Sequence, residues 1–259
     1  MSAAGGDAGA RVFDTHCHLG LDDDGDPRAE HARARAASVT DLVLVGIDLA
    51  SSARARDLAR TLPGARWSAG LHPNDAGRFD AEWDAIAALC GEADCRAVGE
   101  TGLDYYRDRA SAQDQERSLA AHLDLARRRD LPVILHCRDA MAALLELLAA
   151  RAPVRGVMHC FSGDAADAAR AVALGLHVSF AGPLTYKKND ALRQAAAAVP
   201  EDRLLVETDA PFLPPQSRRG KRNEPAFLVE TLATLAAVRG WDLTRAAAVT
   251  HRNAVALFG

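Results

Sequence analysis

Lysine is scarce in this chain of 259 residues: it occurs only at Lys187, Lys188 and Lys221, so arginine supplies almost all of the basic charge. The formal net charge is −4, and no global positive field exists that would attract nucleic acid. This balance argues against a protein that coats nucleic acid non-specifically. Any binding of a polyanion would have to come from a local basic patch or from bound metal.

Paired cysteines and long apolar runs are also lacking. None of the five cysteines forms a C-x-x-C pair, so no disulfide framework is indicated and a reducing cytosol is the simplest compartment. No run approaches the roughly 20 apolar residues of a membrane span. Residues 1–10 lack the apolar centre of a signal peptide and are expected to form a short flexible tail. We therefore expect one cytoplasmic domain over residues 11–259, with no membrane association and no obligate protein partner evident.

The chain does contain short apolar runs that alternate with longer helical segments. Short runs rich in Val, Ile and Leu are typical of strands that are buried on both faces. The predicted strands are Val12–Thr15, Leu42–Ile47, Arg66–Leu71, Arg96–Gly99, Val133–Leu135, Val154–Met158, Leu176–Phe180 and Leu204–Val206. This alternation indicates a parallel sheet.

The segments between the runs are rich in alanine and leucine, and few β-branched residues oppose a helix there. The predicted helices are Ser51–Leu62, Ala81–Cys90, Ala112–Arg129, Ala140–Arg151, Ala165–Leu174 and Ala226–Arg239. Ser51 and Ser111 are expected N-caps, and Gly240 fits a helix end. Eight strands in about 250 residues favour a single (β/α)8 TIM barrel of the α/β class. A doubly wound sheet with extra strands is the alternative.

Polar side chains stand at the ends of most predicted strands. In a barrel, the carboxyl ends of the strands form the face that carries the chemistry. The strand-end histidines and acids are His16, His18, His72, Glu100, His136, His159 and Asp209. To bury so many titratable groups at one rim without a cation would be costly, so their convergence predicts a metal site.

His16 and His18 give the sharpest local signal. Residues two apart on a strand face the same way, so both imidazoles can bind one ion. His136 and His159 end neighbouring strands and are natural ligands of a second ion, and the two oxygens of Glu100 can bridge two cations. Nitrogen and oxygen ligands suit Zn2+ or Mn2+, whereas Mg2+ favours oxygen.

Asp209 completes the predicted ligand set, and a carboxylate beside a metal-bound water can act as a general base. Glu207 lies two residues earlier and shares its face, so it is expected to orient a ligand or to pair with an arginine. The cysteines that directly follow histidines, Cys17, Cys137 and Cys160, are interpreted as small buried residues and not as ligands. Structural or surface positions are assigned to His31, His122, His177 and His251.

The motifs D-T-H-C-H-L, G-L-H-P, G-E-T-G-L-D, H-C-R, H-C-F-S-G, E-T-D-A-P and R-G-K-R-N-E-P together resemble those of the TatD family of metal-dependent deoxyribonucleases, within the amidohydrolase superfamily. The resemblance runs from Asp14 to Phe258. It implies a dinuclear site in which Glu100 bridges two ions. One ion would have His16, His18, Glu100 and Asp209 as ligands, and the other Glu100, His136 and His159.

The resemblance also implies an activity, the hydrolysis of DNA phosphodiester bonds, often as a 3′→5′ exonuclease on single strands. Single-stranded DNA or DNA 3′ ends are thus the expected partner, and two divalent ions (Mg2+, Mn2+ or Zn2+) are the expected cofactors. Cations about 3.5–4 Å apart would neutralise the phosphate and lower the pKa of a water, from which Asp209 would take the proton.

Substrate contacts are expected around this site. His72 and Arg138 lie at strand ends beside it and are expected to contact phosphate oxygens, although a salt bridge within the rim is the alternative for Arg138. The basic loop Arg218–Arg222, which includes Lys221, is either a contact to the DNA backbone or a solvated loop. The pair Tyr105–Tyr106 either stacks on a base or packs against the protein.

Three other functions compete with the nuclease hypothesis. A hydrolase of C–N bonds from the same superfamily often bridges its metals with a carboxylated lysine on the fourth strand, but that position is Glu100 here and no lysine ends the fourth or fifth run. A hydrolase of a small phosphoester would use the same ligands and differ only at the rim. A non-enzymatic scaffold would keep the metal for stability alone.

Overall fold

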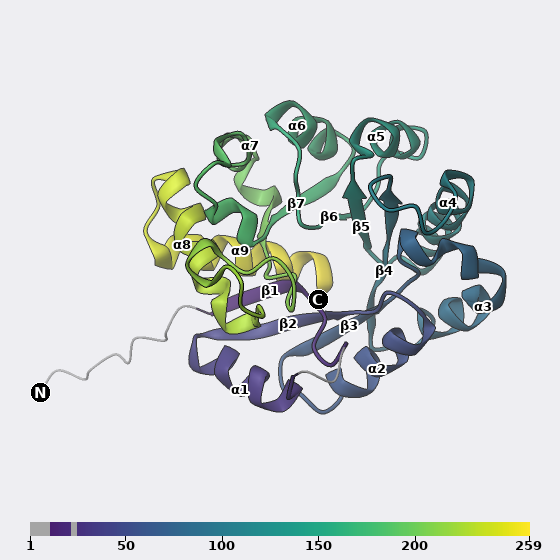
Figure 1. Cartoon of the computed structure of the whole chain (residues 1–259), viewed down its shortest axis with the longest axis horizontal. Helices are drawn as coiled ribbons and strands as arrows, with labels where there is room; N and C mark the ends of the chain where they lie inside the picture. Colours follow the sequence, from purple (N-terminus) through teal and green to yellow (C-terminus); the bar gives the residue numbers. More distant parts are fainter. Residues whose placement is uncertain (1–10, 22–24) are drawn as a thin grey trace, which may run out of the picture.

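The computed structural model describes residues 11–21 and 25–259, so the tail expected over residues 1–10 lies outside the described residues. Eight parallel strands follow one another in sequence order around the sheet, and Figure 1 shows helices α1 to α8 arranged around them. The strands are β1 (Val12–Cys17), β2 (Val39–Val45), β3 (Ala65–Ala69), β4 (Cys95–Asp104), β5 (Val133–Arg138), β6 (Gly156–Met158), β7 (Leu176–Phe180) and β8 (Leu204–Val206). The predicted single (β/α)8 TIM barrel is confirmed.

The barrel closes between its first and last strands. Backbone hydrogen bonds join the segment after β8 to β1, from Asp209 N to His16 O (2.9 Å) and from His18 N to Ala210 O (2.7 Å). The buried carboxylate of Asp14 adds to this seam, because it accepts from the backbone nitrogen (2.9 Å) and the hydroxyl (2.6 Å) of Thr208. The closure places the end of β1 directly beside Asp209.

The helices are α1 (Pro27–Ala36), α2 (Leu49–Ala59), α3 (Phe79–Leu89), α4 (Ala112–Arg129), α5 (Met141–Ala149), α6 (Ala165–Ala173), α7 (Asp190–Ala198), α8 (Leu228–Arg239) and α9 (Leu243–Phe258). The six predicted helices overlap α2 to α6 and α8, but α1, α7 and α9 were not among them. The expected N-cap Ser111 is confirmed at α4. The expectation for Ser51 was wrong, since Asp48 caps α2 and Ser51 is its third helical residue.

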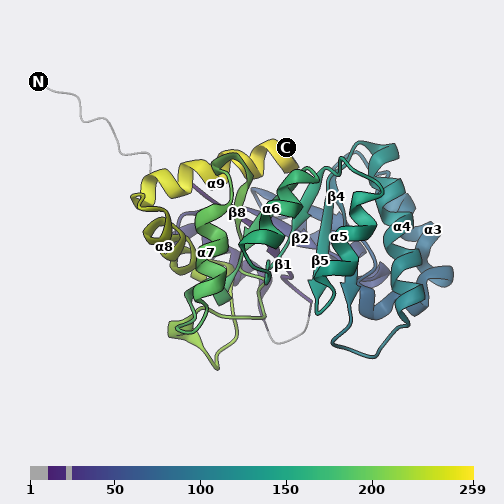
Figure 2. The ribbon, with the colours of Figure 1, turned by 90° about the horizontal axis from the view of Figure 1, so that it is seen from above.

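Helix α9 covers the end of the barrel where the strands begin. Its residues Ala254, Leu257 and Phe258 pack with side chains that fill the barrel interior, among them Phe13 and Ile134. In Figure 2, α9 lies along one side of the molecule, and the loops that follow the strands project on the opposite side. No helix in the described part of the chain combines the length and the apolar character needed to cross a membrane.

Candidate metal centre

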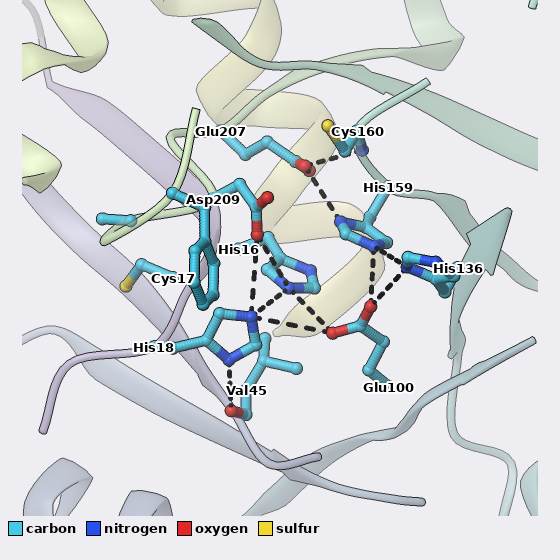
Figure 3. Close-up of polar contacts among 12 residues, drawn as sticks. His16, Cys17, His18, Val45, Glu100, His136, His159, Cys160, Glu207 and Asp209 are labelled. Carbon is cyan, nitrogen blue, oxygen red and sulfur yellow. Dashed lines mark hydrogen bonds and ion pairs between the residues drawn. The ribbon is translucent and has the colours of Figure 1, made fainter. Parts of the chain in front are cut away.

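The predicted ligands come from five separate strand ends, and the structure brings them into one cluster at the carboxyl end of the barrel (Figure 3). Glu100 of β4 lies at its centre. Its Oε2 atom is 3.3 Å from His16 Nε2 and 3.7 Å from His18 Nε2. Its Oε1 atom is 2.9 Å from both His136 Nδ1 and His159 Nε2. Each carboxylate oxygen therefore faces its own pair of imidazoles.

His16 of β1 and His18, which directly follows β1, face each other with their Nε2 atoms only 3.1 Å apart. His18 Nδ1 lies 2.9 Å from the carbonyl oxygen of Val45 and must donate to it, so Nε2 of a neutral His18 carries a lone pair. Asp209 approaches the same atoms, with Oδ1 at 3.7 Å from His16 Nε2 and 3.6 Å from His18 Nε2. This half of the cluster thus gathers two imidazoles and two carboxylates around one point.

His159 is held by a second carboxylate behind it. Its Nδ1 atom lies 3.2 Å from Glu207 Oε1, which also accepts from the backbone nitrogen of Cys160 at 2.6 Å. When Nδ1 donates to Glu207, the lone pair of Nε2 points at Glu100. A carboxylate behind an imidazole is the usual arrangement for a metal-binding histidine. Glu207 was predicted either to orient a ligand or to pair with an arginine, and in the structure it contacts the candidate ligand His159.

Asp104 takes the corresponding place behind His136. The Nε2 atom of His136 lies 3.5 Å from Asp104 Oδ2, and Asn74 Nδ2 donates to the same oxygen at 3.1 Å. Asp104 is buried at the end of β4, four residues after Glu100. Asp104 is the last residue of the G-E-T-G-L-D motif, and no role was predicted for it. Strand alternation puts Asp104 and Glu100 on one face, which was the available signal.

The pKa values of the cluster are coupled through burial and close charges. Burial disfavours the ionised form of Glu100, but the imidazoles around it, His159 foremost, hold the pKa of its carboxyl well below the usual value. Burial also opposes the charge on His159, yet Glu100 and Glu207 raise the pKa of its imidazole well above normal. For Asp209, burial is outweighed by His18 and His16, so its pKa is lowered. Glu100 and Asp209 thus favour the ionised form, and their negative charges need positive charge nearby.

These donor sets fit divalent cations. The ligand atoms of His16, His18 and Glu100 lie within 4.8 Å of one another, as do those of Glu100, His136 and His159. The Nε2 atoms of His16 and His18 can lie this close only when a proton or a cation stands between them, because two facing lone pairs would repel each other. A cation in each set would relieve this repulsion and balance the buried carboxylates, and mixed nitrogen and oxygen donors suit Zn2+ or Mn2+.

A further group, His72, Asp104 and His136, is also compact enough for a cation. However, the backbone nitrogen of Asn74 donates to His72 Nδ1 at 3.1 Å, so the proton of a neutral His72 sits on Nε2. Burial lowers the pKa of His72 to about 3, which keeps the ring neutral. Its Nε2 atom lies 3.6 Å from Glu100 Oε1. His72 therefore presents a hydrogen-bond donor to the cluster and not a free ligand atom.

The other expected substrate contacts lie at different distances from the cluster. Arg138 follows His136 on β5 and stacks on the ring of Tyr106, 3.7 Å from guanidinium carbon to ring centroid. Within residues 11–21 and 25–259 it forms no ion pair, so the alternative of a salt bridge in the rim is not what the structure shows. Tyr106 is 62% exposed and is not part of the core, and its ring contacts the Arg138 guanidinium.

The basic loop 218–222 projects from the same end of the barrel, but two of its cations already face carboxylates. Arg218 Nε is 3.2 Å from Glu230 Oε1, and Arg222 Nε is 3.5 Å from Glu30 Oε1. Arg219 lies over the ring of Tyr186. Lys221 is exposed. The structure does not bring Lys221 into contact with the metal cluster, and its contact with DNA stays a prediction.

The remaining histidines and cysteines take positions outside the cluster. His31 contacts a backbone carbonyl, and His122 Nε2 accepts from the backbone nitrogen of Leu71, which fixes the segment before His72. His251 contacts Asp41 at the opposite end of the barrel. None of the cysteines belongs to a metal-compatible group among the described residues. Cys17 Sγ instead donates to the carbonyl of Val43.

A family profile, related sequences and a solved structure all show similarity between this chain and TatD-related proteins. The profile of a family described as TatD related DNase matches residues 13–259. YabD of Bacillus subtilis, described as an uncharacterized metal-dependent hydrolase, is 34% identical over 253 residues, which cover 95% of this chain and 98% of that protein. The 3'-5' ssDNA/RNA exonuclease TatD of Citrobacter koseri is 39% identical over 236 residues, 88% of this chain and 90% of that protein. The crystal structure of YjjV, a TatD homologue from Escherichia coli, matches with a TM-score of 0.91 at 32% identity and covers 96% of this chain and 98% of that one.

Proposed function

Because this chain belongs to the TatD-related DNase family and is a metal-dependent hydrolase, we propose that it cleaves phosphodiester bonds of single-stranded DNA and removes nucleotides from 3′ ends. The observation that carries the proposal is the central position of Glu100, whose two oxygens face two separate pairs of histidines. A carboxylate shared in this way supports a site for two cations, the arrangement that suits phosphodiester hydrolysis.

The proposed ligands divide between the two halves of the cluster. His16, His18 and Asp209 would hold one ion, His136 and His159 would hold the other, and Glu100 would contact both. Divalent cations bound there supply Lewis acidity, which withdraws charge from a phosphodiester and makes a water molecule more acidic. Glu207 and Asp104, behind the histidines, would keep the ring orientations that such binding requires.

Asp209 is the proposed general base. It has a lowered pKa, so its carboxylate is ionised and able to accept a proton near neutral pH. Its side chain is 11% exposed, more than that of Glu100 at 3%, so it can meet a water at the edge of the cluster. Its backbone is in the left-handed region, with φ 57°, a conformation that aspartate tolerates better than most residues. Proton transfer to Asp209 would leave hydroxide to attack phosphorus.

His72 and Arg138 are the proposed phosphate contacts. The Nε2–H group of His72 faces the cluster, because Nδ1 is occupied by the Asn74 backbone donor. A neutral donor there stabilises negative charge on a phosphate oxygen without competing for a cation. Arg138 supplies a charged planar fork that fits phosphate, and its stacking on Tyr106 restricts the orientation of that fork.

The test is restoration of hydrolysis by metal. The full chain is stripped with chelator and assayed on labelled single-stranded DNA with Mg2+, Mn2+ or Zn2+, and cleavage from the 3′ end is expected with at least one of them. Small phosphoesters and cyclic amides or lactones, assayed beside the DNA, represent the competing hydrolases. Absence of DNA cleavage with every metal would contradict the proposal.

A pair of aspartate variants separates chemistry from folding. Asp209→Asn should reduce turnover by several orders of magnitude. Asp202→Asn is the control, because Asp202 is exposed and lies two residues before the start of β8, and it should leave turnover unchanged. Both variants should show unchanged thermal unfolding in the absence of metal to within a few degrees. Full activity in Asp209→Asn would remove this residue from the mechanism.

A further inference from the structure

Exposed large apolar side chains are concentrated at the end of the barrel that carries the metal cluster. In the described part of the chain they are Tyr105, Tyr106, Phe212, Leu213, Leu243 and Val255, and the first four directly follow β4 or lie in the loop after β8. Phe212 is 50% exposed and its ring lies beside His18, with centroids 6.0 Å apart at an angle of 67°. An aromatic ring thus borders the His16–His18 half of the metal centre.

The turn that carries Phe212 is tied down on both sides. The backbone nitrogen of Phe212 donates to Asp209 O at 2.8 Å, which closes the turn directly after the proposed base. The buried side chain of Asn223 donates to the carbonyls of Phe212 (2.7 Å) and Thr208 (2.8 Å). Asn223 comes from the R-G-K-R-N-E-P motif, for which the metal chemistry gives no role.

The backbone conformation of this turn is also imposed by its surroundings. Leu213 has φ 49°, a left-handed conformation that leucine adopts only when neighbouring structure holds it there. Its carbonyl oxygen lies so close to Gly182 that a Cβ atom on residue 182 would be 2.1 Å from it. These contacts fix the backbone that carries Phe212 and so hold its exposed ring beside the metal cluster. An aromatic side chain that was merely exposed to solvent would not need such a fixed backbone.

A fixed, exposed aromatic ring beside a phosphodiester site suits a nucleobase. Every base has a π face that can stack on an aromatic side chain, and such stacking tolerates any sequence. We propose that Phe212 is the platform on which an unpaired base next to the scissile phosphate stacks, an inference that rests on the proposed nuclease function. A base within a duplex is already stacked and paired, so this platform would favour single strands and frayed ends.

The test compares Phe212→Ala and Phe212→Tyr with the wild-type full chain in the presence of the activating metal. Two single-stranded oligonucleotides are used, identical except that one carries abasic residues at the last two positions of its 3′ end. With the normal oligonucleotide, Phe212→Ala should lower kcat/KM about 10- to 100-fold, mainly through KM, because one stacked base is lost. Phe212→Tyr keeps the ring and should stay close to the wild type.

The abasic oligonucleotide isolates the stacking contact. The wild type and both variants should hydrolyse it at equal rates, since no base is present to meet the ring. Leu243→Ala removes an equally exposed apolar side chain on α9 and should leave both rates unchanged. Thermal unfolding checks that Phe212→Ala is folded, as expected for a half-exposed ring.

The outcomes distinguish the two proposals. If the wild type cleaves DNA and Phe212→Ala matches it on the normal oligonucleotide, the platform is wrong and the nuclease function stands. If Phe212→Ala loses the same factor in kcat/KM on the normal and abasic oligonucleotides, the platform is also wrong. The ring would then support the structure of the protein and would not stack on a base. If the wild type cleaves neither oligonucleotide, the nuclease function itself fails and the platform fails with it.

Discussion

The Nδ1 atom of His159 lies 3.2 Å from Oε1 of Glu207. This contact fixes which nitrogen of the imidazole faces Glu100, because a ring that donates from Nδ1 keeps its lone pair on Nε2. Glu207 is buried. Its oxygen also accepts from the backbone of Cys160 at 2.6 Å, so the position of the carboxylate is itself fixed. The orientation of one proposed ligand therefore depends on a residue that need not touch the metal.

Replacement of Glu207 should weaken metal binding without removing a ligand. Glu207→Gln keeps an acceptor for the Cys160 backbone but loses the charge, and removal of such supporting groups typically costs about 10- to 100-fold in metal affinity or activity. Titration of stripped protein with Zn2+ or Mn2+ by calorimetry measures the change. Glu207→Ala should lower the metal affinity more than Glu207→Gln does. Unaltered affinity in both variants would show that His159 needs no support.

The number of bound ions can be read from thermal or urea unfolding at several metal concentrations. A ligand that binds only the folded state adds about 1.4 kcal/mol of stability per tenfold increase above its Kd, so two ions should add about 2.8 kcal/mol. His136→Ala should reduce this dependence towards that of one ion. His251→Ala, at the other end of the barrel, should lower stability but keep the full dependence. A single-ion slope in the wild type would contradict the dinuclear site.

His72→Ala should separate hydrogen-bond donation from metal binding. Because His72 Nδ1 accepts from Asn74, we expect its Nε2–H to contact phosphate, and its loss should lower kcat/KM on DNA by about 10- to 100-fold. The metal content, measured by atomic absorption after dialysis, should stay equal to that of the wild type. A variant that loses an ion would instead make His72 a ligand.

Acid unfolding should reveal the contribution of Asp41. Burial opposes its charge, but bonds from Thr40, Arg66 and Arg11 hold the pKa of its carboxyl well below the ordinary 3.8. A lowered folded-state pKa gives stability that is present above about pH 4 and lost as pH falls towards the folded value. Asp41→Asn should therefore cost about 1–2 kcal/mol at pH 7. The difference from wild type in urea unfolding should shrink between pH 5 and pH 2, and a constant difference would refute this account.

The fold could be predicted because the strands of a barrel are buried on both faces and the sequence shows each as an apolar run. The cluster followed from that, since the carboxyl ends of parallel strands share one rim and His16 and His18 share one face. Helix α1 was missed because its sequence is dominated by charged residues, and only the Asp26 cap and Pro27 mark its start. An apolar pattern marks an element in the sequence only where much of that element is buried.

Contacts between distant segments could not be predicted in the same way. Phenylalanine is usually a core residue, so the sequence gives no sign that Phe212 is exposed. The turn that exposes it is held by a hydrogen bond from Asn223 and by the close contact between Leu213 and Gly182. The tautomer of His72 depends on a turn two residues later, and Arg138 stacks on the ring of Tyr106 and does not form the salt bridge that was the alternative to a phosphate contact. These features depend on three-dimensional neighbours that no single run of residues encodes. The family membership was evident from the motifs and is confirmed.

Helix α9 packs into the amino end of the barrel and shuts it with Leu257 and Phe258. In the proposed function, substrate would therefore enter and product would leave at the same end of the barrel, which carries the exposed rings of Phe212 and Tyr106. A mononucleotide that lingers there after cleavage would block the advance of the shortened strand. Under the proposed exonuclease function, departure of the cleaved nucleotide, and not only bond breaking, would be a step that can limit the rate of successive cleavages.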